Sequence, residues 1–107
     1  MSKITLDYNG KEYTLEYSRQ SVKTMESQGF VYDQLFTKPV TMIPTLFNGA
    51  FIKNHRGTKR DVMDAIYDEI PDKSGILQAL LEMYAETLST LTEDKDAEGN
   101  VSWTLVK

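Results

Sequence analysis

The chain has 107 residues, a length typical of one domain, and 40% of them are hydrophobic, which is enough for a modest core. It contains no cysteine, which excludes disulfides, thiol catalysis and cysteine metal sites. Residues 1–60 carry nine basic and five acidic side chains, and residues 61–107 carry three basic and eleven acidic ones, for a net charge of −4.

Two short stretches of alternating apolar and polar residues open the chain. They are separated by Asn9-Gly10, a pair that tolerates the positive φ angles of a type I′ turn. The sequence therefore predicts an N-terminal β-hairpin. The alternating apolar positions are Ile4, Leu6 and Tyr8, then Tyr13, Leu15 and Tyr17.

The next segment favours a short helix with clear end signals. Ser18 is a suitable N-cap, and the helix is expected to run to about Gln28. Gly29 would follow it in the left-handed conformation, and Phe30 would pack back as the hydrophobic contact. One further helical turn is expected at residues 33–36, before Thr37-Lys38-Pro39 breaks the chain.

Three more helices are predicted from apolar stripes and capping residues. The first runs from a cap at Thr41 to about Asn54, with Pro44 in its first turn, where a proline is tolerated. The second is capped by Thr58 and ended by Pro71, and the third runs from a cap at Asp72 to about Leu91.

Residues 92–107 differ from the rest of the chain. Residues 92–100 are polar and acidic, which indicates an exposed linker. Val101, Trp103 and Leu105 then alternate with polar residues, so this stretch is either a third strand on the hairpin or a mobile tail. The predicted fold is thus α+β and mainly helical, with one globular domain at residues 1–91 and a linker with a terminal strand or tail at residues 92–107.

No arrangement of residues indicates catalysis, a cofactor or a metal site. His55 is the single histidine, so no zinc or iron site can be built from imidazoles, and we expect it to be a solvated and dispensable residue at a helix end. The carboxylates lie in no apolar pattern that would raise a pKa for acid–base work. No apolar run reaches the about 20 residues of a membrane span, and the polar N-terminus is unlike a signal peptide, so a cytoplasmic location is expected.

Two groups of side chains are candidates for contacting a protein partner. Four phenylalanines near two prolines would form an interaction patch if they are exposed, and would be ordinary core residues otherwise. A basic cluster follows them, but the next helix is acidic and the whole chain is acidic, which argues against nucleic-acid binding. The candidate partner-binding residues are Phe30, Phe36, Phe47, Phe51, Lys53, Arg56, Lys59 and Arg60.

The uneven charge has two readings. The acidic second half is either a solvated surface or one of two complementary faces that attract copies of the chain head to tail.

Several short motifs resemble a family of small proteins encoded among the tail genes of long-tailed phages of Gram-positive bacteria. The motifs are Met-Glu-x-x-Gly-Phe, Leu-Phe-x-Gly-Ala-Phe-x-x-x-His and Leu-Glu-Met-Tyr. The residues are Met25, Glu26, Gly29, Phe30, Leu46, Phe47, Gly49, Ala50, Phe51, His55 and Leu81 to Tyr84. The family is similar to the tail assembly chaperones, which bind the tape measure protein and help tail tube subunits polymerise around it.

This resemblance implies a non-enzymatic binding protein that forms homo-oligomers in the cytoplasm of the bacterial host, with the tape measure protein and tail tube subunits as partners. The alternatives are a structural tail or connector protein retained in the virion and, third, a small DNA-binding regulator.

Overall fold

The computed structural model describes residues 2–92 and 99–107. An antiparallel hairpin comes first and is followed by helices, so the predicted α+β, mainly helical fold is confirmed. The elements are β1 (Ile4–Tyr8), β2 (Lys11–Leu15), α1 (Arg19–Ser27), the 3-10 turn η1 (Tyr32–Gln34), α2 (Pro39–Gly49), α3 (Arg60–Glu69) and α4 (Lys73–Ser89).

The hairpin forms as the Asn-Gly pair predicts. Asn9 and Gly10 have φ angles of 50° and 78°, which a two-residue type I′ turn requires. Ile4 pairs with Leu15 and Leu6 with Tyr13, so the apolar side chains of both strands share one face. That face packs on the helices, and the opposite face is turned to solvent.

Helix α1 begins and ends at its expected signals. The side chain of Ser18 accepts a hydrogen bond from the Ser21 backbone, and the Ser21 side chain accepts one from the Ser18 backbone. At the other end Gly29 has a φ of 100°, Phe30 N–H donates to Met25 O, and Gly29 N–H donates to Glu26 O. These two bonds make a Schellman motif, and Phe30 turns back into the core.

Helices α2 and α3 differ from the expected boundaries. Helix α2 begins at Pro39, not at Thr41, because proline suits the first helical position and lacks the N–H that would be unpaired there. It ends at Gly49, five residues before the expected end at Asn54. Helix α3 has Lys59 as its N-cap residue without a side-chain bond, so Thr58 does not cap it.

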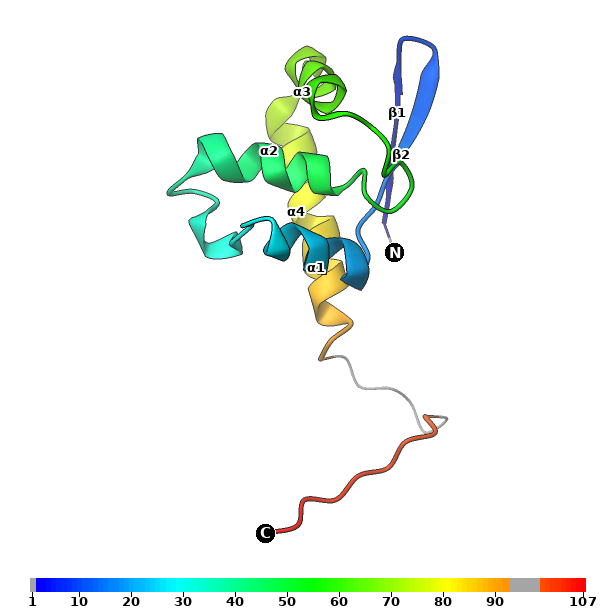
Figure 1. Cartoon of the computed structure of the whole chain (residues 1–107), viewed down its shortest axis with the longest axis vertical. Coiled ribbons are helices and arrows are strands. Elements are labelled where there is room, and N and C mark those ends of the chain that lie inside the picture. Colours follow the sequence, from blue (N-terminus) through cyan, green and yellow to red (C-terminus); the bar gives the residue numbers. More distant parts are fainter. Residues whose placement is uncertain (1, 93–98) are drawn as a thin grey trace.

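Helix α4 is capped as predicted and lies at the centre of the fold. The Asp72 carboxylate accepts from Gly75 N–H at 3.0 Å. Helices α1 and α2 lie across α4, and the hairpin stands beside them (Figure 1). Leu80, Met83 and Tyr84 of α4 enter the same buried cluster as Leu46 and Phe47 of α2.

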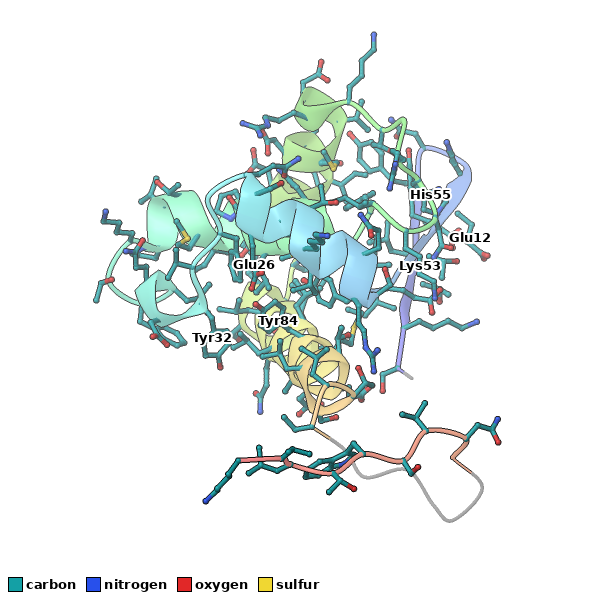
Figure 2. All side chains as sticks on the ribbon, turned by 60° about the horizontal axis from the view of Figure 1, so that its bottom comes forward. Glu12, Glu26, Tyr32, Lys53, His55 and Tyr84 are labelled. Carbon is teal, nitrogen blue, oxygen red and sulfur yellow. The ribbon has the colours of Figure 1, made fainter. Side chains whose placement is uncertain are left out.

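The outer edge of β2 is closed by the segment that follows α2. Glu16 N–H donates to Ala50 O at 3.0 Å, Asn54 Nδ2 donates to Thr14 O at 3.2 Å, and Thr14 N–H donates to His55 Nε2 at 2.9 Å. Figure 2 shows His55 beside the hairpin, where its ring also meets the edge of Tyr13. The expectation of a solvated His55 is therefore corrected: it is half-buried and joins the chain after α2 to β2. Its dispensability stays a prediction.

Residues 99–107 form neither a helix nor a strand, so the third strand is absent from this structure. Their apolar side chains are largely exposed, Trp103 by 84%. Most of the expected acidic linker, residues 93–98, lies outside the described residues. Among the helices that are described, none has both the length and the apolar character that crossing a membrane requires.

Candidate protein-binding surface

An exposed apolar patch lies between α1 and the first turn of α2. It consists of Val31, Tyr32, Phe36 and Val40, of which Phe36 and Val40 are 72% and 88% exposed. Large apolar side chains that gather on a surface are typical of contacts with other proteins. The patch is therefore the first part of a candidate binding surface.

The backbone beneath this apolar patch is held by buried neighbours. Leu35 is fully buried between the exposed residues, and Val31 N–H donates weakly to Met42 Sδ at 3.5 Å. The ring of Tyr32 stacks on that of Tyr84, with centroids 5.5 Å apart and planes 12° apart, and Figure 2 shows the two together. The patch is thus presented by a fixed segment.

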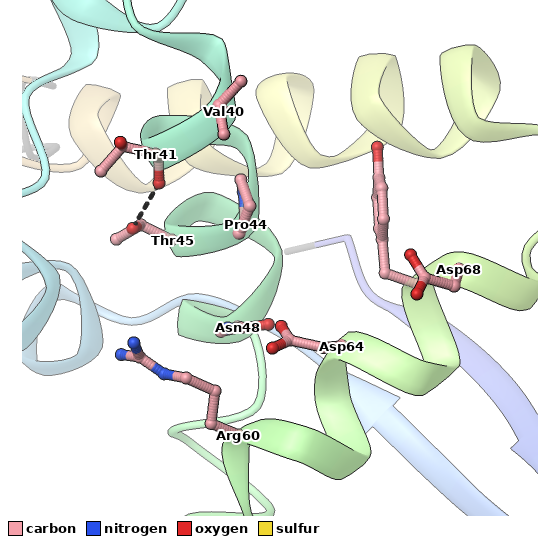
Figure 3. Close-up of a pocket in the computed structure, with 9 residues that line it drawn as sticks. Val40, Thr41, Pro44, Thr45, Asn48, Arg60, Asp64 and Asp68 are labelled. Atoms are coloured by element: carbon pink, nitrogen blue, oxygen red, sulfur yellow. Dashed lines mark hydrogen bonds between the residues drawn. The ribbon is translucent and has the colours of Figure 1, made fainter.

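A cleft of about 350 Å³ adjoins the patch at Val40 (Figure 3). One wall is a face of α2, and the other is a face of α3. Pro44 lies in the α2 wall and has no N–H, so the usual helical bond to the carbonyl of Val40 is missing. The lining residues are Val40, Thr41, Pro44, Thr45, Asn48, Arg60, Asp64, Tyr67 and Asp68.

The α2 wall is unusual for the outer face of a helix. A surface helix normally carries charged residues opposite its core face. Helix α2 contains no charged residue at all, and its outer positions are Val40, Thr41, Pro44, Thr45 and Asn48. A half-exposed helix face without charge suits a contact that removes it from water.

The α3 wall supplies hydrogen-bond acceptors. Asp64 and Asp68 face the cleft, and neither forms an ion pair with any residue that the structure describes. Asn48 Oδ1 is buried, accepts no hydrogen bond from the residues that the structure describes, and points toward Asp64 in Figure 3. Burial raises the pKa of Tyr67, whose phenol is neutral at physiological pH even at the ordinary value of 10.0. The cleft therefore favours an apolar ligand that also carries donors, such as a lysine or arginine side chain.

The four candidate phenylalanines differ in how exposed their side chains are. Phe30, Phe47 and Phe51 are at most 2% exposed, which corrects the expectation that they contact a partner. Their rings pack edge-to-face on other aromatic rings of the core, Phe47 on Phe51 among them. Phe36 alone of the four is exposed and stays a candidate.

The four residues of the basic cluster also differ in their surroundings. Lys53 Nζ lies 3.2 Å from Glu16 Oε2, so this charge is already paired. A hydrogen bond from Asn54, and then the Lys53 ammonium, lower the pKa of Glu16. Arg56 and Arg60 line a second cleft, between α1 and α3, and Arg60 also borders the first. Lys59 is exposed just before α3. Arg56 and Lys59 line a third cleft together, so Arg56 adjoins both Lys59 and Arg60, and Lys53 alone is held apart by its ion pair.

A family model described as "Domain of unknown function (DUF5055)" matches residues 1–106 of this sequence. The chain belongs to this family. No curated protein and no solved structure matches it. The surface of this DUF5055 chain must therefore be interpreted from its own chemistry. Its described residues contain no group of three or more His, Cys, Asp or Glu placed to hold a metal ion.

Sequence reasoning missed Val31, Tyr32 and Val40 of this DUF5055 chain. For Val40 a signal exists: once the helix is started at Pro39, Val40, Pro44 and Asn48 follow one another at four-residue spacing on an uncharged face. For Val31 and Tyr32 no periodic signal exists, because their segment is too short. Their exposure depends on Leu35 turning inward.

Proposed function

We propose that this protein is a non-enzymatic phage tail assembly chaperone that binds the tape measure protein in the cytoplasm of the bacterial host. It would hold that protein until tail tube subunits polymerise around it. The resemblance of the Met-Glu-x-x-Gly-Phe and Leu-Phe-x-Gly-Ala-Phe motifs supplies the partner's identity. The exposed surface of α2 supplies the means of binding.

The observation that carries the binding function is the uncharged outer face of α2, which includes the exposed Val40, and the exposed Phe36 that precedes it in the chain. An amphipathic helix can lay its apolar face on such a surface. A basic side chain on that helix would reach Asp64 and Asp68 in the cleft. A tape measure protein, as a long amphipathic helix, would offer both features and would be kept soluble by the contact.

The test is co-expression with a tape measure protein of a long-tailed phage of Gram-positive bacteria, followed by capture and titration. Phe36→Asp and Val40→Asp should each weaken binding by at least about tenfold, since exposed apolar anchors dominate such contacts. Leu91→Asp is the matched control, because Leu91 is also exposed, by 64%, but lies beyond the end of α4. Unchanged binding in the first two variants would refute this surface, and no capture by the unmodified chain would refute the function.

Purified virions provide a second test. A chaperone acts before the tail is complete and should be absent from virions. Its stoichiometric presence in them would favour a structural tail or connector protein instead.

We also propose that copies self-associate along the tape measure protein, because the net charges of residues 1–60 and 61–107 are opposite. Screening weakens such attraction, since the Debye length is about 10 Å at 0.1 M salt and about 3 Å at 1 M. Oligomers in light scattering should therefore shrink as salt rises toward about 0.5 M. Combining Lys59→Glu with Arg60→Glu should act like added salt, and a monomer at all salt concentrations would contradict the idea.

A further inference from the structure

The two edges of the hairpin differ. The outer edge of β2 is occupied by Ala50, Asn54 and His55, as described above. No residue in the described part of the chain hydrogen-bonds to the outer edge of β1. An open strand edge is a template for another strand.

The register shows which groups of β1 are open. Tyr8 and Lys11 close the two-residue turn and exchange hydrogen bonds, and such pairs alternate along an antiparallel ladder. Backbone groups of Leu6 and Ile4 therefore point to β2. Those of Thr5 and Asp7 point outward. The outward bonds of Thr14 and Glu16 on β2 follow the same alternation.

An apolar cleft of about 330 Å³ lies along this open edge. Leu6 and Tyr8 of β1 form one side, and Ile66, Ile70 and Pro71 at the end of α3 form the other. Two carboxylates, Asp7 and Glu69, stand among the lining residues. A strand added beside β1 would turn every second side chain toward this cleft.

Residues 101–106, with the sequence Val-Ser-Trp-Thr-Leu-Val, have the pattern such a strand needs. Val101, Trp103 and Leu105 occupy alternate positions and are 88%, 84% and 69% exposed. Lys107 is the only charged side chain of residues 100–107 and is opposite in sign to the two carboxylates of the cleft. In Figure 1 this segment extends away from the helices, and it makes no hydrogen bond to the other described residues.

We propose that residues 101–106 of one copy add as a third strand to the open edge of β1 in a second copy. When residues 101–105 overlap fully with Ile4–Tyr8, either strand direction puts Trp103 opposite Leu6, with its indole toward the cleft. The occupant is a second copy because residues 99–107 extend away from their own hairpin (Figure 1). The contact does not depend on the identity of any other partner.

Trp103 is the only tryptophan, so its fluorescence reports this contact directly. At about 0.5 M salt, where charge attraction is screened, the emission should shift to the blue and the molar mass should rise together as the protein is concentrated. Emission of an exposed indole at every concentration would overturn the proposal. A blue-shifted emission in a species that stays monomeric would also overturn it, because it would mean docking on the same chain.

A matched pair of variants tests the acceptor edge. Thr5→Pro removes one outward N–H but no hairpin bond, and proline is tolerated on edge strands. It should weaken association by at least about tenfold, whereas Thr5→Val keeps the N–H and should stay within about twofold of the unmodified chain. Circular dichroism verifies that the Thr5→Pro hairpin is folded. Equal association of the two variants would overturn the proposal.

A second pair tests the donor segment without touching the hairpin. Trp103→Gln should abolish the concentration-dependent rise in mass. Ser102→Gln adds the same neutral side chain one residue away, on the other face of the strand, and should largely retain the rise. Equal effects of the two variants would overturn the proposal. Because the chain has no cysteine, mixing a Thr5→Cys protein with a Thr104→Cys or Ser102→Cys protein and adding oxidised glutathione should give a disulfide-linked pair of chains. Its absence from both mixtures would likewise overturn the proposal.

Discussion

The contact between Gly49 and Met25 allows the packing of α1 on α2 to be tested quantitatively. A Cβ at Gly49 would lie 2.5 Å from Met25 Cγ and even closer to Sδ, well inside the limit of real contacts. Met25 is fully buried, so it cannot move aside into solvent. Overpacking of this kind costs about 1–3 kcal/mol, and the better helix propensity of alanine returns at most about 1 kcal/mol.

We therefore expect Gly49→Ala to lower the free energy of unfolding by about 1–2 kcal/mol, which corresponds to about 4–16 °C in melting temperature for a domain of this size. Met25→Ala alone should cost about 2–5 kcal/mol. In the double variant the clash is gone, so introducing Gly49→Ala into the Met25→Ala chain should cost nothing or restore stability. The coupling energy should thus be about 1–3 kcal/mol.

Urea unfolding followed by circular dichroism measures all four proteins, since the single tryptophan lies outside the core. Gly57→Ala is the control, because a Cβ there meets no atom within 4 Å, and it should change stability by at most about 0.5 kcal/mol. If Gly49→Ala costs the same with and without Met25, the reasoning about this close approach is refuted.

Three further expectations concern the core, the histidine and acid. Phe47→Ala and Leu80→Ala should cost about 3–5 and 2–5 kcal/mol, since both side chains are fully buried; a melting temperature within a degree of the original would contradict this. His55→Ala should cost about 1–3 kcal/mol, because the N–H of Thr14 loses its acceptor; unchanged urea unfolding would show that water replaces the imidazole. Because the pKa of Glu16 is lowered on folding, its contribution is complete above the ordinary pKa of 4.5 and is lost as the pH falls through the folded value. Between pH 5 and 3 the unmodified chain should lose stability more steeply than Glu16→Gln, and parallel curves would exclude the effect.

Local signals predicted much of the fold. The hairpin turn and three helix ends could be predicted from sequence, because the residue that forms each of them depends only on neighbours a few positions away. These residues are Asn9-Gly10, Ser18, Gly29 and Asp72. The beginning of α2 differs from the predicted one because proline, which breaks a helix in its interior, is accepted in the first helical turn.

Contacts between distant segments could not be predicted in this way. Thr14 and His55 are 41 residues apart, and nothing in either residue type indicates the other as its partner. The exposure of the candidate surface is likewise set by contacts between distant segments. Phe36 and Phe47 are the same residue type, yet Phe36 is exposed and Phe47 is buried. Packing at Leu35 and on α4 determines which side of each segment faces inward.

The closed edge of β2 has a consequence for aggregation. Small sheets risk growing in both directions into fibres, and natural proteins prevent this by covering or charging their edges. Here the chain after α2 covers the outer side of β2 at Thr14 and Glu16 through Ala50, Asn54 and His55, so growth through backbone pairing is favoured from β1. Loss of His55 would thus do more than lower stability: it would uncover part of a second edge and should make the protein more prone to form amyloid-like deposits at high concentration.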